Sequence, residues 1–123
     1  MKVLLSIKPE FANKILTGEK RFEFRKSLFK RTGITTVIIY ATMPVGKVIG
    51  EFDIDLVISN SPQEVWSMTS EYSGITKSFF DSYFTDRDTA YAIKVKKVRK
   101  YDTPQDLDDV KHGLKAPQSY VYI

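Results

Sequence analysis

Cysteine is absent from the 123 residues, and histidine occurs once. A chain without cysteine has no disulfide framework, no thiolate zinc site and no cysteine nucleophile, and one histidine argues against most transition-metal sites. We therefore expect no resident metal and no cofactor. No apolar run is long enough to span a membrane, and the first residues have no small-residue cleavage site. These features predict a cytoplasmic protein that does not enter a membrane.

Length and composition fit a folded domain. The sequence is 42% hydrophobic and 13% aromatic, and no long stretch is dominated by serine, glycine or charge. A chain of this length can bury most of its apolar side chains in one core. We expect a single domain over residues 1–123 and favour a monomer.

Charge is unevenly distributed along the chain. Residues 1–31 carry nine lysines or arginines against three glutamates, residues 51–90 carry eight acidic residues against two basic ones, and residues 91–101 carry five cations and no acid. The two basic segments either converge on one positive face, as in polyanion-binding domains, or form scattered solvated charge.

The apolar pattern predicts five or six strands and two or three short helices. Strands are expected at residues 2–7, 20–25, 34–41, 47–59, 89–101 and 117–123. Helices are expected from Pro9 to Gly18, from Ser61 and after Thr76, with one more short turn from Thr103. Most strands follow one another without a helical crossover, which favours an α+β domain built on a small barrel or a strongly curved sheet.

Local irregularities and aromatic residues have structural interpretations. Gly50 and Val98 break the alternation of their strands and predict β-bulges, with a close backbone approach as the alternative at Gly50. Trp66 is expected in the core. The aromatic stripe after Thr76 is also expected in the core rather than on a base-stacking surface; it comprises Phe79, Phe80, Tyr83 and Phe84.

The stretch GEKRFEFRK, residues 18–26, alternates apolar and charged side chains. Phe22 and Phe24 are expected to point into the core, which leaves three charged side chains on the other face of the strand: Arg21, Glu23 and Arg25. One interpretation is a solvated ladder of ion pairs, worth about 0 to 1 kcal/mol each.

The other interpretation is a ligand cleft. Gly18 can end the preceding helix in the left-handed conformation, so the charged strand is expected to run back alongside the first strand, with Lys8 at that strand's end. Arginine binds phosphate through paired hydrogen bonds, lysine supplies a point charge, and a carboxylate accepts from a base or a ribose hydroxyl. This set suits RNA or a nucleotide.

The same stretch resembles the signature of the ASCH domains, a branch of the PUA-like superfamily. The signature G-x-K-x-x-E-x-R stands complete as Gly18, Lys20, Glu23 and Arg25. The blocks LSIKPEFANKIL, YATMPVGKVIGEF and APQSYVYI resemble those of small stand-alone members, so the resemblance covers essentially the whole chain. It implies a PUA-like small mixed β-barrel whose cleft, between the first helix and the sheet, binds RNA or a modified nucleotide.

The resemblance implies a binding module first and a hydrolase second. The residues expected to hold RNA or a nucleotide-like ligand are Lys8, Lys20, Arg21, Glu23, Arg25, Gln118 and Ser119. As a hydrolase the domain would use Lys20 and Glu23, either as a ribonuclease or like the acetylcytidine amidohydrolases of similar size. The catalytic threonine of those amidohydrolases falls on Glu23, where a carboxylate would act as a general base or pair with Arg25. A regulatory role is a weaker alternative, since no helix-turn-helix pattern is present.

Four further features have two interpretations each. Glu51 is either a second site carboxylate or part of a solvated face, and His112 is expected in a loop rather than in catalysis. The cations of Lys94–Lys100 either track phosphates or protect a sheet edge from pairing. Gln118 and Ser119 either read a base edge or take part in a turn.

Overall fold

The computed structural model describes residues 1–123, which form one six-stranded sheet and four α-helices. The strands are β1 (Lys2–Ile7), β2 (Phe22–Arg25), β3 (Thr36–Ala41), β4 (Lys47–Asn60), β5 (Ala90–Gln105) and β6 (Tyr120–Tyr122). The helices are α1 (Pro9–Leu16), α2 (Pro62–Thr69), α3 (Lys77–Tyr83) and α4 (Leu107–Val110), with a 3₁₀ turn, η1, at Ser70–Tyr72. No helix has the length and apolarity needed to cross a membrane.

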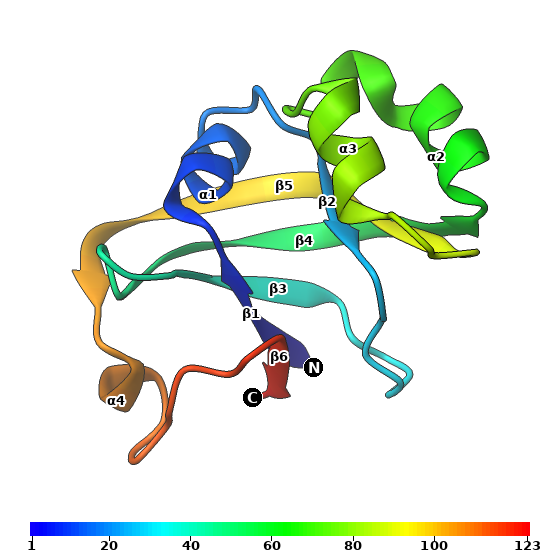
Figure 1. Cartoon of the computed structure of the whole chain (residues 1–123). Coiled ribbons are helices and arrows are strands. Elements are labelled where there is room, and N and C mark those ends of the chain that lie inside the picture. Colours follow the sequence, from blue (N-terminus) through cyan, green and yellow to red (C-terminus); the bar gives the residue numbers. More distant parts are fainter.

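The sheet is mixed and curves into a half-barrel, which confirms the predicted α+β class. Its strand order is β2-β5-β4-β3-β1-β6, with β1 and β3 parallel and every other neighbouring pair antiparallel. In Figure 1 the long strands β4 and β5 run across the molecule, and the two chain ends lie near each other beside β6. The predicted count of five to six strands is correct, the longer helices α1, α2 and α3 match the predicted two or three, and α4 is the further short turn.

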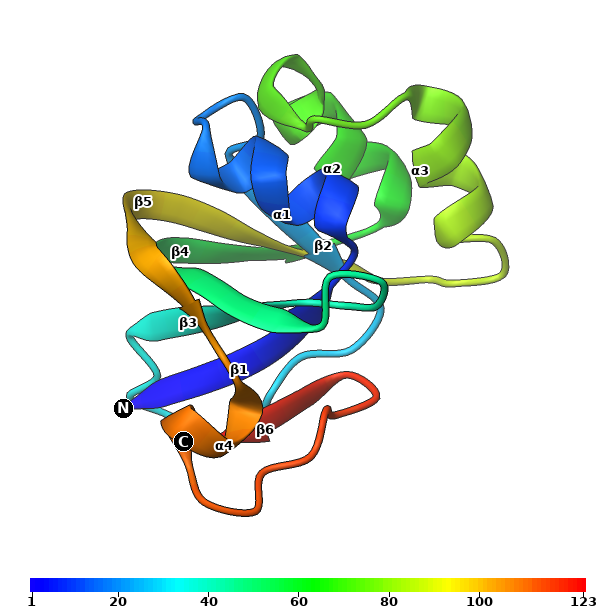
Figure 2. The same cartoon turned by 90° about the vertical axis from the view of Figure 1, so that its left-hand side faces the viewer.

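Helices cover the sheet on two sides. Figure 2 shows α1, α2 and α3 gathered above the sheet, while α4 lies at the opposite end with β6. One buried cluster joins α1 to β1, β3, β4 and β5, a second joins β2 to α2 and α3, and a third lies under α4. Both faces of β2 are therefore buried, because its phenylalanines pack on α2 and α3 while its other face turns toward β1.

The end of α1 fixes the start of the charged stretch. Pro9 begins the helix, and Gly18 adopts a φ of +84° immediately after it, as predicted for a helix stop. The Gly18 amide donates to the Ile15 carbonyl and the Lys20 amide donates to the Lys14 carbonyl, both at the end of the helix. Lys20 is therefore held where the chain reverses out of α1.

Both predicted strand irregularities are present. The β3–β4 register shifts beside Gly50, where an added Cβ would lie 2.8 Å from both the Arg99 carbonyl oxygen and Leu16 Cδ2. The close backbone approach is therefore also confirmed. The β4–β5 register shifts between Val95 and Lys97, where the apolar alternation slips.

Two predictions of the chain path are wrong. The strand Phe22–Arg25 pairs with β5 and not with β1, so the two basic segments meet by strand pairing at one sheet edge. The last helix does not start at Thr103: β5 continues to Gln105, and Asp106 caps α4 through a reciprocal hydrogen-bonded capping box. The carboxylate side chain of Asp106 supplies the helix start that the Thr103-Pro104 pair was expected to give.

A candidate site between the first helix, the motif strand and the third helix

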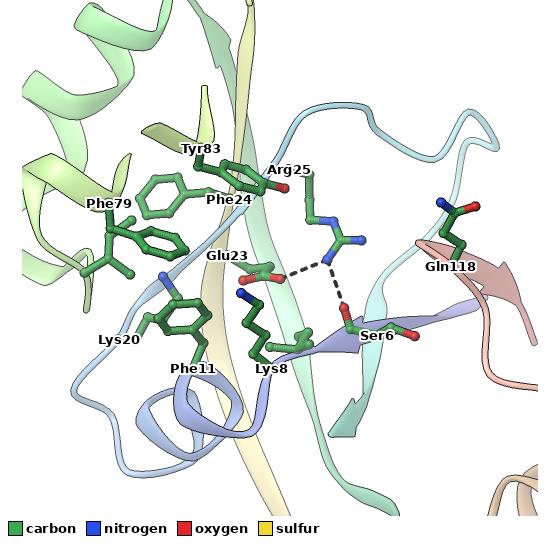
Figure 3. A pocket seen from close by; sticks show the side chains of 12 residues that line it. Ser6, Lys8, Phe11, Lys20, Glu23, Phe24, Arg25, Phe79, Tyr83 and Gln118 are labelled. Atoms are coloured by element: carbon green, nitrogen blue, oxygen red, sulfur yellow. Dashed lines mark hydrogen bonds and ion pairs between the residues drawn. The ribbon is translucent and has the colours of Figure 1, made fainter. Parts of the chain in front are cut away.

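One cavity of about 230 Å³ opens where the end of β1 and the start of α1 face β2 and α3 (Figure 3). Half of its lining is apolar and half is polar or charged: Ser6, Ile7, Lys8, Phe11, Lys20, Glu23, Phe24, Arg25, Ile75, Phe79, Tyr83 and Gln118. Drug-sized ligands occupy pockets of about 300–1,000 Å³, so this cavity suits a smaller group.

Lys20 is the most deeply buried charged side chain of the cavity. The residue is 2% exposed, and its Nζ lies 4.6 Å from the centre of the Phe24 ring and 5.4 Å from that of Phe11. Burial lowers the pKa of this amine from 10.5 to about 8, although the nearby Glu23 carboxylate opposes the shift. An amine with this pKa is a proton donor close to neutral pH.

The loop between η1 and α3 holds the amine in place. The Ser73 carbonyl accepts a hydrogen bond of 2.6 Å from Lys20 Nζ, and Gly74 lies against the lysine stem with a φ of +70°. A Cβ added at Gly74 would lie 2.6 Å from the Cβ of Lys20. The Gly74 carbonyl accepts from Lys14 Nζ at 3.1 Å, which ties the same loop to α1. Sequence reasoning missed this loop, because neither residue belongs to the signature.

Arg25 joins the two ends of the open sheet. Its Nη1 donates to the Ser6 carbonyl at 3.2 Å and to the Glu23 carboxylate at 3.1 Å. Its Nη2 donates to the Ser119 carbonyl at 3.1 Å and to the Ser119 hydroxyl at 2.8 Å. The guanidinium thus connects edge strand β2 to β1 and to the segment before β6, across the gap that no backbone pairing closes.

Glu23 shows that the solvated-ladder interpretation is wrong. Its side chain is 7% exposed and that of Arg25 is 13% exposed, so the pair is buried rather than solvated. The charged face of β2 turns inward, because the strand curves over the cavity toward β1.

The structure brings together most of the predicted site residues. Lys8, Lys20, Glu23, Arg25 and Gln118 line the cavity, and Ser119 lies behind it as a partner of Arg25. Arg21 does not join them: its guanidinium stacks 4.1 Å from the centre of the Tyr72 ring, on the exposed side of the chain.

The aromatic stripe divides between core and cavity. Phe80 and Phe84 are 1% and 3% exposed, as predicted, but Phe79 is 37% exposed, and it lines the cavity together with Tyr83. The core assignment was therefore wrong for Phe79. Aromatic residues at positions i, i+1, i+4 and i+5 lie on one side of a helix, so their spacing does not distinguish Phe79 from the core positions. Trp66 packs in the core cluster, as predicted.

Other candidate residues lie away from the cavity. Glu51 is 8% exposed and is bound by Arg99, Tyr101 and Lys2. Burial alone would raise its pKa, but hydrogen bonds from Arg99 and Tyr101 leave the pKa of this carboxyl below its usual value. Glu51 is thus neither a cavity carboxylate nor solvated. His112 lies in an exposed loop, as predicted, and pairs with Asp108.

The cations of residues 94–100 also lie outside the cavity lining. Lys94 pairs with Asp55 and Arg99 with Glu51 and Asp53, so part of the charge of β5 is neutralised by β4. β5 pairs on both sides up to Val95, and its later residues pair with β4 alone. No group of three or more histidine, cysteine, aspartate or glutamate side chains is arranged to hold a metal ion.

The half-barrel and its cavity define the class of protein as an α+β domain with a basic, aromatic pocket beneath the first helix. Residues 5–99 match the ASCH domain family, and the chain belongs to that family. The family resemblance read from GxKxxExR is therefore confirmed.

The chain is similar to two named proteins and to one crystal structure. It is 31% identical over 122 residues to large ribosomal subunit protein uL22 of Ureaplasma parvum; the match covers 98% of this chain and only 39% of that protein. It is 25% identical to an ASCH domain-containing ribonuclease of Zymomonas mobilis, over 99% of this chain and 84% of that protein. The crystal structure of ASCH from Zymomonas mobilis superposes with a TM-score of 0.91 at 25% identity, covering 99% of this chain and 87% of that one.

Proposed function

We propose that this ASCH domain is a ribonuclease in which Lys20 and Glu23 act as general acid and general base. The observation that carries the proposal is the pocket itself. The buried ammonium of Lys20 and the carboxylate of Glu23, both from the signature, face the same small cavity. The whole-chain similarity to a Zymomonas ribonuclease supports RNA as the substrate.

The proposed reaction transfers a phosphoryl group within the substrate. Glu23 takes the proton of a ribose 2′-hydroxyl, and the 2′-oxygen forms a bond to the adjacent phosphorus. The bond from phosphorus to the 5′-oxygen breaks, and that oxygen receives a proton from the Lys20 ammonium. The products are a 2′,3′-cyclic phosphate and a 5′-hydroxyl. Lys8, exposed at the rim of the cavity, stabilises the charge that develops on the phosphoryl oxygens.

Arg25 acts in this scheme as a positioning residue. Its four hydrogen bonds to Ser6, Glu23 and Ser119 leave it committed to the protein. Because one of them goes to Glu23 Oε2, the guanidinium orients the carboxylate that serves as the base.

The test is a cleavage assay with a labelled RNA oligonucleotide and its 2′-O-methyl analogue, each with and without EDTA. We expect cleavage of the RNA alone, unchanged by EDTA, with cyclic phosphate ends identified by mass spectrometry. Cleavage of the 2′-O-methyl analogue would contradict the role of the 2′-hydroxyl. Loss of activity in EDTA would assign the stabilising charge to a metal ion instead of Lys8.

RNA or nucleotide binding without turnover is the second candidate, because three cations line one cavity: Lys8, Lys20 and Arg25. It predicts salt-sensitive binding of RNA that is recovered intact. Hydrolysis of acetylcytidine without cleavage of RNA would instead indicate that Lys20 and Glu23 hydrolyse an acetyl amide.

A further inference from the structure

We propose that Phe79 and Tyr83 form a stacking platform for one unpaired nucleobase, and that Lys8 and Lys26 bind the phosphates on either side of it. This subsite rests on the proposed RNA substrate and adds the residues that bind the nucleotide. Nothing in the signature GxKxxExR includes Phe79, Tyr83 or Lys26.

The two rings present nearly parallel faces. They lie one helical turn apart on α3, with planes within 11° of parallel and centres 6.3 Å apart. Phe11, from α1, meets the Phe79 ring edge-on at 68° with a centre distance of 5.2 Å, which supports that ring from the side. Figure 3 shows Phe79 and Tyr83 on the same side of the cavity, opposite Lys8.

Phe79 stays partly exposed although it packs against Phe11. Phe80 and Phe84 from the same helix complete the core under β2, whereas Phe79 is left 37% exposed at the cavity. A large apolar ring open to solvent beside polar groups is a feature of ligand sites. Aromatic side chains that stack bases in RNA-binding proteins are exposed in the same way.

Each platform ring has its own exposed lysine. Lys8 Nζ lies 5.8 Å from the centre of the Phe79 ring, and Lys26 Nζ lies 4.7 Å from that of Tyr83. Exposed cation–π contacts are worth about 0.5–1 kcal/mol, whereas stacking of a base is worth about 1–3 kcal/mol. A base can therefore displace the ammonium groups, which then bind phosphates. A flat group flanked by two anions fits this arrangement, and a nucleotide within a strand has that shape and charge.

The size of the cavity sets how much of the strand enters. A volume of about 230 Å³ is smaller than a drug-sized pocket and has room for a single base but not for a base pair, so the stacked base must be unpaired. Stacking depends on the π-face that every base has, and we therefore expect weak discrimination among the four bases.

The experiment measures binding without turnover. The probe is a fluorescein-labelled 2′-O-methyl octauridylate, which lacks the 2′-hydroxyl that cleavage needs, and the readout is fluorescence anisotropy across a salt series. The variants are Phe79→Leu, Phe79→Trp, Lys8→Ala and Lys26→Ala. Lys97→Ala is the matched control, because Lys97 is exposed on β5 and does not line the cavity. Thermal unfolding followed by circular dichroism checks that each variant is folded.

Loss of the flat ring in Phe79→Leu should raise the Kd by about 5- to 150-fold, and Phe79→Trp should bind at least as tightly as the wild type. Lys8→Ala and Lys26→Ala should each reduce the slope of log K against log salt by about 0.7, and Lys97→Ala should leave it unchanged. Wild-type affinity in Phe79→Leu, or no binding of the probe by the wild type, would overturn the platform. Equal slopes in all three lysine variants would overturn the phosphate assignment.

The two proposals fail in different ways. A wild type that binds the probe through Phe79 but cleaves no RNA would retain the platform and refute the ribonuclease. A wild type that cleaves RNA while Phe79→Leu leaves both probe binding and KM unchanged would retain the ribonuclease and refute the platform.

Discussion

Replacing Lys20 by methionine tests whether the amine is shielded from solvent, as its burial indicates. The residue is 2% exposed, and burial lowers its pKa from 10.5 to about 8. A shift of this size corresponds to about 3 kcal/mol, at about 1.4 kcal/mol per pH unit. Below pH 8 the ammonium is charged in both the folded and the unfolded state, so its burial lowers the free energy of unfolding by this full amount.

The sign of the pH dependence follows from proton binding. Between pH 8 and 10.5 the unfolded chain keeps the lysine proton while the folded chain has lost it, so the free energy of unfolding rises with pH. The stability of the wild type relative to Lys20→Met should therefore increase by about 2–3 kcal/mol from pH 7 to pH 10. Titrating groups that do not interact with Lys20 are common to both proteins and cancel in this difference, whereas Glu23 and Lys14 interact with it.

The assay is urea unfolding of both proteins at several pH values in this range. Methionine keeps the apolar stem against Phe11 and Phe24 but cannot titrate. Lys97→Met serves as the control for the loss of one lysine charge, since this lysine is exposed on β5. If the free energies of unfolding of the wild type and Lys20→Met differ by a constant amount from pH 7 to 10, the solvent-shielded environment assigned to Lys20 is refuted.

Three further predictions concern the residues around the site. Arg25→Met should lower the free energy of unfolding by about 3–5 kcal/mol in urea titrations, because it leaves the buried Glu23 carboxylate without its partner; a loss below 1 kcal/mol would contradict the bridging role. Gly74 has a φ of +70° and lies against Lys20, so Gly74→Ala should destabilise the fold by about 1–3 kcal/mol. The same change should return the pKa of Lys20 toward 10.5 in an NMR titration. An unchanged pKa would show that the loop does not hold the amine. Hydrogen bonds from Arg99 lower the pKa of Asp53 to about 2, so stability should be lost as pH falls from 4 toward 2, and acid unfolding of Asp53→Asn should lack this component.

Local structure was predictable from sequence because its causes are local. Pro9 and Gly18 bound the first helix, and the slips of alternation at Gly50 and Val98 mark the bulges. Strand pairing was not predictable in the same way. β2 pairs with β5, whose residues lie about 70 positions further along the chain, and the amphipathic pattern of β2 fits either neighbour equally well.

The site was predictable as far as the signature reaches. Lys20, Glu23 and Arg25 meet at one cavity, but the pattern does not show that Glu23 is buried, because its burial depends on how β2 faces β1 and α3 in the folded chain. The platform was missed for a related reason. Periodicity groups the aromatic residues of α3 on one side of a helix, and only the position of β2 and α1 decides that Phe79 faces the cavity.

The most direct test of the central claim is the rate of RNA cleavage by Glu23→Gln. Glutamine keeps the shape of glutamate and can still accept the Arg25 hydrogen bond, but it cannot take a proton from the 2′-hydroxyl. We expect a fall of at least about 100-fold in kcat in a variant that circular dichroism shows to be folded at the assay temperature, while Glu64→Gln, on the exposed surface of α2, cleaves at the wild-type rate. Wild-type kcat in folded Glu23→Gln would contradict the assignment of Glu23 as the base.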